Sequence, residues 1–346
     1  MRPAGFDADL LVAGGGPAGL ATALLARRAG LSVVVVEPRA DPIDKACGEG
    51  LMPGGLARLL ALGVDPAGVP FHGIAYRAGR RSAHARFAAG PGRGVRRTTL
   101  QAALRERAAS AGIEWSCGRV AGLRQDAHGV EAAGVRARWL VGADGLHSRV
   151  RREAGIASAA GTPARFGQRR HYAVAPWSDL VEVWWSAHAE AYVTPVAPDL
   201  VGVAILHRRA GLGYEALLEG FPELKARLGG AGPAGPVRGA GPLRRTVRAR
   251  VRGRVLLVGD AAGYEDALTG EGVSLALDQA EAAVSALVSG DLAGYEAQWR
   301  RRTRTYRLLT RGLVLLTAAR PVRGAVVPLC VAVPPLFRGA VNVLAG

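Results

Sequence analysis

The first residues whose types and spacing could do chemistry form a glycine-rich turn after a short apolar run. Glycine at the first position of such a turn permits a sharp change of direction. At the third it leaves room for a diphosphate, and at the sixth it lets helix and strand pack closely. The diphosphate would lie on the N-terminus of the following helix, where free N–H groups and the helix dipole favour negative charge. The turn is Gly14-Gly15-Gly16-Pro17-Ala18-Gly19, and its candidate nucleotide-binding residues are Gly14, Gly16, Pro17, Ala18 and Gly19.

The elements that must position this turn are a strand at residues 10–12, a helix at 17–28 and a second strand at 33–36. The second strand ends in Glu37, whose carboxylate can accept both ribose hydroxyls of an adenosine. Together these parts form a βαβ unit with a dinucleotide fingerprint. The unit alone leaves open whether the dinucleotide is NAD or FAD.

Two further apolar strands end in glycines and an acid. The strand at 135–141 leads into Gly142-Ala143-Asp144-Gly145, and the strand at 254–258 leads into Gly259-Asp260. Ligand contacts in α/β proteins gather at such strand ends. After the third strand end, Gly270 and Gly272 precede a helix at 273–287, whose N-terminus is available to an anion. We therefore expect Asp144, Gly259, Asp260, Gly270 and Gly272 to contribute to the same site.

The loop at residues 38–53 supplies further candidates. It contains Cys47-Gly48-Glu49-Gly50, and glycines on both sides of an acid indicate a backbone that approaches another group closely. Cys47 is a candidate catalytic residue, with burial as a small apolar side chain as the alternative. Arg39 and Lys45 of this loop, and Arg97 near the start of a helix at 100–111, are candidate cofactor-binding residues.

A second region, at residues 165–207, is rich in β-branched and aromatic residues, which predicts antiparallel sheet. Trp184 and Tyr192 are its candidate substrate-binding residues, with core packing as the alternative for each. A helix is predicted at residues 214–228, followed by a connector rich in glycine, proline and alanine at 229–241.

The composition describes a globular protein and limits its partners. Apolar residues make up 49% of the 346 residues and charged residues 21%, which argues against disorder. The net charge is +17, but lysine occurs only at positions 45 and 225, and the arginines are spread along the whole chain. We therefore expect no nucleic-acid partner and assign the charge to anionic cofactors, substrates or lipid headgroups. Three scattered cysteines predict no metal site and no disulfide framework, so the expected compartment is the cytoplasm.

The order of the three strand ends resembles the flavoprotein family of aromatic-ring hydroxylases. This resemblance implies FAD as the cofactor, with Asp260 on the ribityl chain, Asp144 supporting the cofactor region and Arg97 near the flavin or its phosphates. Cys47 would then lie in the loop that faces the isoalloxazine ring, as a proton donor or a contact that tunes the flavin.

A narrower resemblance is to the geranylgeranyl reductases of the same superfamily. Cys47-Gly48-Glu49-Gly50 and Leu268-Thr269-Gly270-Glu271-Gly272 carry it. The segment Ala191-Tyr192-Val193-Thr194-Pro195 matches the Tyr-x-Trp-x-Phe-Pro of those enzymes only in part, because Thr194 stands where tryptophan would be.

The predicted fold class is α/β: a Rossmann-like FAD-binding domain with an inserted antiparallel β-sheet substrate domain and a C-terminal helical, partly hydrophobic tail. The FAD-binding domain is assigned to residues 1–70, 95–155 and 245–290, the substrate lobe to 71–94 and 156–244, and the tail to 291–346. The tail mixes apolar runs with arginines and prolines, and no run reaches the length of a transmembrane helix. A surface-lying anchor at a membrane, a lid over an apolar pocket and packing on the protein's own core remain open for it.

The sequence thus predicts an FAD-dependent oxidoreductase with a hydrophobic small-molecule substrate. A monooxygenase that hydroxylates an aromatic or polyketide-type substrate through a flavin C4a-hydroperoxide is favoured, and the alternative is a reductase of double bonds in prenyl or polyene lipids. The expected electron donor is NAD(P)H, bound transiently.

Overall fold

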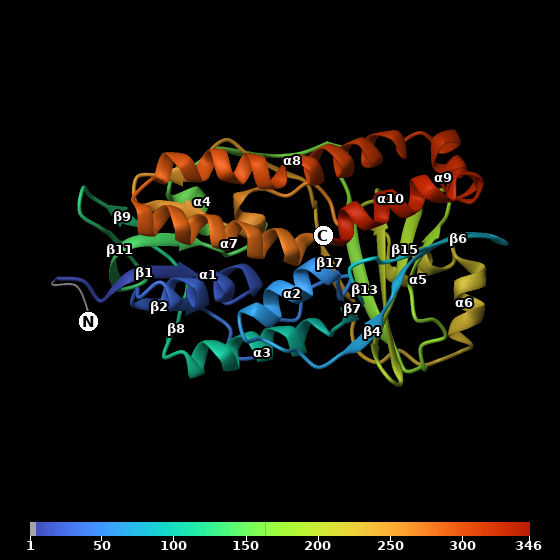
Figure 1. Cartoon of the computed structure of the whole chain (residues 1–346), viewed down its shortest axis with the longest axis horizontal. Coiled ribbons are helices and arrows are strands. Elements are labelled where there is room, and N and C mark those ends of the chain that lie inside the picture. The colour runs from blue at the N-terminus through green and yellow to red at the C-terminus, as the bar shows by residue number, and fades with distance from the viewer. Residues whose placement is uncertain (1–4, 163) are drawn as a thin grey trace.

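In the computed structural model, which describes residues 5–162 and 164–346, two large β-sheets lie along the long axis of the molecule (Figure 1). Residues 1–4 of the predicted FAD-binding domain and residue 163 of the predicted substrate lobe lie outside the described residues. The first sheet has the strand order β19-β20-β11-β1-β2-β8, with β10 and β9 added beside β11. Its strands are β1 (Ala8–Ala13), β2 (Val33–Glu37), β8 (Glu114–Cys117), β9 (Arg124–Gln125), β10 (Val130–Ala132), β11 (Val135–Gly142), β19 (Val251–Arg252) and β20 (Val255–Leu257).

The central strands of this sheet are parallel and buried on both faces, as continuous apolar runs predict. Helix α1 (Pro17–Arg28) packs against α3 (Arg97–Ser110) and α7 (Gly272–Ser289), and α2 (Pro53–Ala61) lies beside α7. The buried positions of α1 are mostly glycine, alanine and leucine. The small glycine and alanine residues among them allow the helix to approach the sheet closely. Two short helical segments, α4 (Arg149–Glu153) and η1 (Gly259–Ala262), follow β11 and β20.

The second sheet has seven strands in the order β17-β13-β16-β15-β14-β5-β6. Neighbours are antiparallel except β5 and β14, which come from distant parts of the chain and run parallel. Helices α5 (Tyr214–Leu218) and α6 (Pro222–Leu228) cover one face. The strands are β5 (Gly73–Ala78), β6 (Arg81–Arg86), β13 (Phe166–Tyr172), β14 (Val181–Trp185), β15 (Ala189–Ala197), β16 (Leu200–His207) and β17 (Arg238–Ala240).

Two small sheets complete the β structure. One consists of β3 (Gly50–Leu51), β7 (Gly92–Gly94) and β4 (Val69–Phe71), and the other pairs β12 (Ser158–Ala160) with β18 (Arg245–Val247). Strand β7 pairs with β3, which directly follows the Cys47 loop, so this sheet anchors that loop.

Three helices form the C-terminal region: α8 (Leu292–Leu316), α9 (Arg320–Ala332) and α10 (Pro334–Ala345). Figure 1 shows α8 running along the molecule from the first sheet to the second, where α9 and α10 pack on β5 and β6. Among the described residues, no single helix has both the length and the apolar composition to cross a membrane. Helices α8 and α9 meet those criteria only as a pair, with a bend of 118° between them. The predicted α/β fold class, with its helical C-terminal region, is confirmed.

Candidate functional site

The three strand ends named from the sequence lie side by side at one edge of the first sheet. Ala13 at the end of β1 is in register with Gly142 of β11, and Gly142 is in register with Leu257 of β20. The turns that follow these strands therefore open at the same level. A Cβ on Gly259 would lie 2.8 Å from the Cβ of Ala18, so the third turn packs directly on the first helix.

The glycines of the first turn have separate structural roles. Gly14 has a φ of +112°, and a Cβ there would lie 2.5 Å from the carbonyl oxygen of Ala143. A Cβ on Gly19 would lie 1.9 Å from the carbonyl oxygen of Gly14. Gly16 is different, because its Cβ would meet only the Arg97 guanidinium, at 3.7 Å. The space over Gly16 is thus open and faces a cation, and Gly16 caps α1 without a side-chain hydrogen bond to the helix N–H groups. This is the arrangement that a diphosphate requires.

Glu37 is buried at the end of β2, where its carboxylate holds the turn. One oxygen accepts the N–H of Gly15 at 2.9 Å, and the other accepts the Nε–H of Arg39 at 2.6 Å. The exposed Arg39 side chain thus pairs with Glu37 at the adenosine end of the predicted site. Trp115 borders the same place, since a Cβ on Gly15 would lie 2.4 Å from its ring.

Asp144 lies at the second strand end and caps α4. Its Oδ2 accepts the N–H groups of Arg149 and Val150 at 2.6 and 3.0 Å, while its Oδ1 is buried and has no partner within residues 5–162 and 164–346. Lys45 reaches the same turn, because its Nζ lies 3.1 Å from the Cβ position of Gly145. The loop after β2 is therefore brought against the second strand end.

The third strand end joins Asp260, in η1, to the N-terminus of α7. Gly272 begins α7 and Gly270 lies two residues earlier, with a φ of +72°. Burial raises the pKa of Glu271, which precedes the helix, to about 7, and one of its carboxylate oxygens is buried without a partner. Asp260 and Gly272 also line a pocket walled by Trp299 of α8. Its volume of about 30 Å³ is room for a water molecule or two, so it is not the ligand cavity.

The Cys47 loop is held by a buried polar network that the sequence did not reveal. The N–H of Glu49 donates to the Cys47 sulfur at 3.4 Å, and the carboxylate of Glu49 accepts the N–H of Arg97 at 2.9 Å. Glu49 has a φ of +59°, an unfavourable conformation for a residue with a side chain. Such strain persists only where surrounding contacts fix it.

His171 of β13 provides one of those contacts. Its Nε2 lies 2.6 Å from the Glu49 carboxylate, and its Nδ1 lies 3.1 Å from a guanidinium nitrogen of Arg169. Because arginine can only donate, Nδ1 is the acceptor and the proton of a neutral His171 resides on Nε2, which donates to Glu49. Arg169 also pairs with Asp44. The loop is thereby fixed to the second sheet by Glu49, His171 and Arg169.

Cys47 itself is half-buried. Burial raises the pKa of its thiol, and the positive charge of Arg97 opposes this shift only in part. The thiol is therefore protonated at neutral pH, and Cys47 is suited to donate a proton rather than to act as a nucleophile.

The face of the second sheet turned toward the cofactor loop is apolar and aromatic. Tyr192 donates from its hydroxyl to the carbonyl oxygen of Leu268 at 2.8 Å, which joins β15 to the loop before Gly270. Trp185 packs on the same face, with Leu268, Val314 and Val327. Trp184 points to the opposite face, where it packs with α5 and α6 and donates to Glu182 at 3.0 Å. Trp185, and not Trp184, therefore lies on the face toward the cofactor loop.

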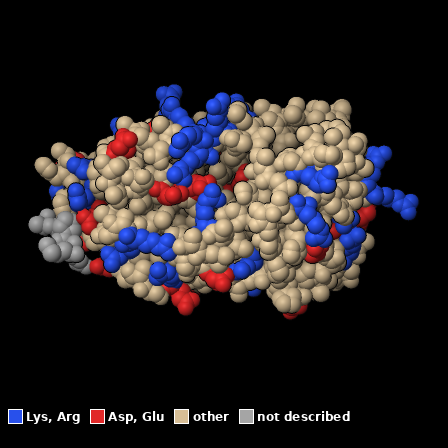
Figure 2. Space-filling model, viewed as in Figure 1, with Lys and Arg blue, Asp and Glu red and all other residues tan. Residues whose placement is uncertain are grey.

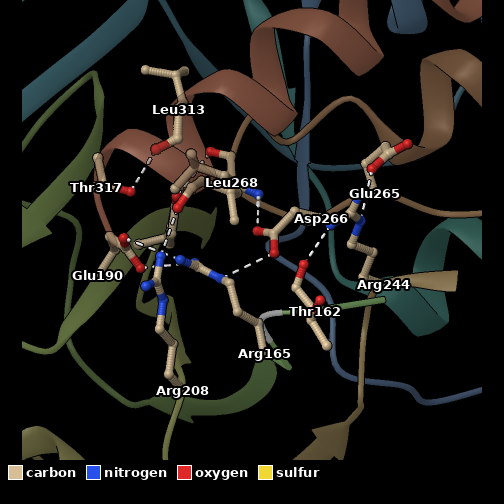
Figure 3. Close-up of polar contacts among 12 residues, drawn as sticks. Thr162, Arg165, Glu190, Arg208, Arg244, Glu265, Asp266, Leu268, Leu313 and Thr317 are labelled. Carbon is tan, nitrogen blue, oxygen red and sulfur yellow. Dashed lines mark hydrogen bonds and ion pairs between the residues drawn. The ribbon is translucent and has the colours of Figure 1, made fainter. Parts of the chain in front are cut away.

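A buried ionic cluster closes the site on the side of the C-terminal helices (Figure 3). Arg165 pairs with Glu190 at 2.9 Å and with Asp266 at 3.0 Å. Arg323 of α9 also pairs with Glu190, at 2.8 Å. Burial raises the pKa of Asp266 to about 6, against the opposing charge of Arg165. Asp266 Oδ1 accepts the N–H of Leu268, so the cluster also supports the loop that Tyr192 contacts.

The residues brought together fit an FAD molecule. Arg97 faces the open diphosphate space, while Arg97 Nε, Asp144 Oδ1 and Glu271 Oε2 are buried polar atoms that have no partner among the residues the structure describes. Such atoms cost free energy unless a ligand or water satisfies them. Among the described residues, no group of three His, Cys, Asp or Glu side chains is arranged to hold a metal ion.

Comparison with known proteins agrees with this assignment. Residues 7–207 match the family model described as an FAD binding domain. The chain is 28% identical to a menaquinone reductase of Mycolicibacterium smegmatis, over 84% of this chain and 79% of that protein. It is 31% identical to the 6-methylpretetramide 4-monooxygenase of Streptomyces rimosus, over 83% of this chain and 76% of that protein. It is 30% identical to the digeranylgeranylglycerophospholipid reductase of Methanosarcina acetivorans, over 85% of this chain and 81% of that protein. The fold also matches the solved structure of the flavin-dependent brominase Bmp2, with a TM-score of 0.80 and 19% identity. The match covers 98% of this chain and 93% of the brominase chain.

Proposed function

Because the chain belongs to the family of FAD-binding-domain flavoproteins, we propose that it is a monooxygenase of a hydrophobic aromatic or polyketide-type substrate. The observation that carries the proposal is the contact of Thr194, whose hydroxyl donates to the carbonyl oxygen of Gly48 at 2.8 Å. The geranylgeranyl reductases that the chain resembles have a large apolar tryptophan at this position. Here the position is small and polar, and its hydroxyl fixes the Cys47 loop.

The shape and polarity of the neighbouring face support a ring-shaped substrate. Tyr76 lies beside Trp185, with ring centroids 5.4 Å apart, and both belong to the apolar face that includes Leu268 and Tyr192. Flat aromatic rings pack well against such side chains. The hydroxyl of Tyr192 is engaged with Leu268, so it orients the loop, and its ring is part of this apolar face.

The residues of the chain then have defined tasks in the proposed reaction. FAD, once reduced, supplies the oxygen-activating chemistry, and NAD(P)H is the proposed transient electron donor. Gly16 and Arg97 would hold the diphosphate, and Asp260 the ribityl chain. The Glu49–His171 pair would keep the Cys47 loop in place, with the His171 Nε2 proton held in the hydrogen bond to Glu49. The apolar face and the C-terminal helices would exclude water.

Reduction of an alkene is the second candidate, and the protonated thiol of Cys47 favours it. A reductase needs an acid to protonate the carbon next to the one that receives hydride, and a buried thiol with a raised pKa could serve. The 30% identity to a prenyl-lipid reductase points the same way.

Isotope-labelled oxygen separates the two candidates. The FAD-loaded protein is supplied with NADPH or NADH, a hydrophobic naphthol and isotopically heavy dioxygen, and the product is analysed by mass spectrometry. Incorporation of one heavy oxygen atom is the expected result, and Cys47→Ser should retain this activity. A geranylgeranyl substrate that gains two hydrogens without oxygen, in a reaction lost in Cys47→Ser, would replace the proposal with the reductase assignment.

A further inference from the structure

Beyond Glu296, the C-terminal helices carry charge of only one sign. From residue 297 to 346 the sequence contains nine arginines, no lysine and neither aspartate nor glutamate. Arg323 is buried in the ionic cluster, whereas Arg301, Arg304, Arg311, Arg320 and Arg338 are exposed. The surface of this region therefore attracts anionic partners.

Exposed leucines share a face of α8 with two of these arginines. Arg304, Leu308, Arg311 and Leu315 follow one another at spacings of four, three and four, which places them on one stripe of an α-helix. Leu308 is 64% exposed and Leu315 is 49% exposed. The opposite side of α8 is buried through Trp299, Tyr306, Val314 and others at a similar spacing. The outward stripe is thus both basic and apolar.

Helices α9 and α10 extend the exposed apolar surface. Leu329 of α9 and Leu336 and Val343 of α10 are 53%, 61% and 61% exposed. Figure 2 shows basic side chains gathered over the middle of α8 and a broad area almost free of charge toward α9. We name this surface the tail face; its large apolar residues are Leu308, Leu309, Leu315, Leu316, Val322, Leu329, Val331, Val333, Leu336 and Val343. Monomeric proteins rarely expose so many large apolar side chains together without a partner.

We propose that the tail face binds the surface of an anionic lipid bilayer. Helices with leucines and arginines on their exposed side lie in the headgroup region, with apolar side chains inserted and arginines against phosphates. A second copy of this chain fits less well, because a symmetric pairing would bring the tail-face arginines against one another, and residues 297–346 contain no acidic residue to neutralise them. The proposal does not depend on which reaction the flavin performs.

The same helices also form the inner wall of the apolar face described above. Val314 and Val327 pack inward with Trp185 and Leu268, while Leu315 and Leu329 point outward. A chain docked through the tail face would thus hold its apolar interior one helix layer from the bilayer, close to where lipid-soluble compounds reside.

Vesicle co-sedimentation of the FAD-loaded full chain tests the proposal. We expect binding to vesicles of phosphatidylcholine with phosphatidylglycerol, weaker binding to phosphatidylcholine alone, and a decline as salt is raised. Each arginine near an anionic surface contributes about fivefold to binding, so Arg304→Gln/Arg311→Gln should bind about 25-fold more weakly. Leu308→Asn/Leu315→Asn should bind at least about tenfold more weakly, because it loses the inserted side chains.

The matched control is Arg124→Gln/Val288→Asn, which changes an exposed arginine and an exposed valine outside the tail. It should bind like the unchanged protein, and unchanged flavin absorbance in every variant would show that the fold is retained. The proposal is overturned if the unchanged protein binds no vesicle at low salt, or if the control loses binding as much as the tail variants. It is also overturned if the leucine variant abolishes self-association in analytical ultracentrifugation while vesicle binding persists, since the tail face would then be an interface between copies.

Discussion

Replacing Arg323 by methionine should detach α9 from the ionic cluster that supports the site. Arg323 is 5% exposed, donates to Glu190 at 2.8 Å and to the carbonyl oxygen of Ser186 at 2.6 Å, and has its guanidinium 5.4 Å from the ring centre of Trp185. Methionine keeps the apolar stem over the tryptophan but removes the charge and both hydrogen bonds. The effect on stability therefore reports the ionic contact with Glu190 together with the hydrogen bond to Ser186.

The size of the effect follows from what remains around Glu190. Removing one partner of a buried ion pair costs about 3–5 kcal/mol, because the other charge is left without compensation. Arg165 continues to pair with Glu190, so we expect the lower end, about 3 kcal/mol. For a chain of this length that corresponds to a fall in Tm of about 4 °C. Hydrogen exchange should also become faster in α9.

The assay is thermal unfolding of the FAD-loaded protein, with Arg320→Met as the control. Arg320 begins the same helix but is exposed, so its replacement should change the free energy of unfolding by less than about 0.5 kcal/mol. Combining Arg323→Met with Glu190→Gln should give a non-additive result of at least about 1 kcal/mol. If Arg323→Met and Arg320→Met are equally stable, the cluster does not hold α9 and the reasoning is wrong.

The remaining predictions concern the cofactor and pH. Gly16→Val should fold, because a Cβ there meets only Arg97 at 3.7 Å, but it should lose FAD because the valine side chain fills the diphosphate space. Normal flavin content in this variant would contradict the assigned site. Gly19→Val should misfold instead, because a Cβ there lies 1.9 Å from the carbonyl oxygen of Gly14. Asp260→Ala should purify with most of its FAD lost, and full retention measured by absorbance would exclude the ribityl role. Burial raises the pKa of Asp266 to about 6 from 3.8, so the folded state binds the proton more tightly. Stability should therefore fall by up to about 3 kcal/mol as pH rises from about 4 to about 6, and Asp266→Asn should flatten that part of a Tm-against-pH profile.

The cofactor end of the site was predictable because its signals are local. Each strand end is an apolar run followed directly by glycine and an acid, and the parallel register of β1, β11 and β20 then brings the three turns together. The fold class followed from the same pattern. The FAD assignment came from the order of these motifs along the chain, which the matching family model supports.

The substrate side depends on contacts that no short stretch of sequence encodes. Glu49 meets His171 only because β13 places that histidine against a loop 122 residues earlier. Trp184 and Trp185 are adjacent and similar, and only the pairing of β14 with β5 and β15 decides which of them faces the cofactor loop. The predicted helix at 214–228 is two helices, because Pro222 begins α6 and lacks the N–H that a continuous helix would need.

Two arginines fix the C-terminal helices in the orientation that both proposals need. Arg323 joins α9 to Glu190, and Arg208 of the second sheet donates to the carbonyl oxygen of Val314 near the end of α8 at 2.6 Å. These contacts turn Val314 and Val327 inward, toward the aromatic face, and leave Leu315 and Leu329 outward. Because Glu190 also pairs with Arg165, and Arg165 with Asp266, the same cluster sets the position of the loop that carries Leu268. The buried charges therefore hold the outer tail face and the inner apolar face in one fixed relation, so a change that loosens Arg323 should disturb the two together.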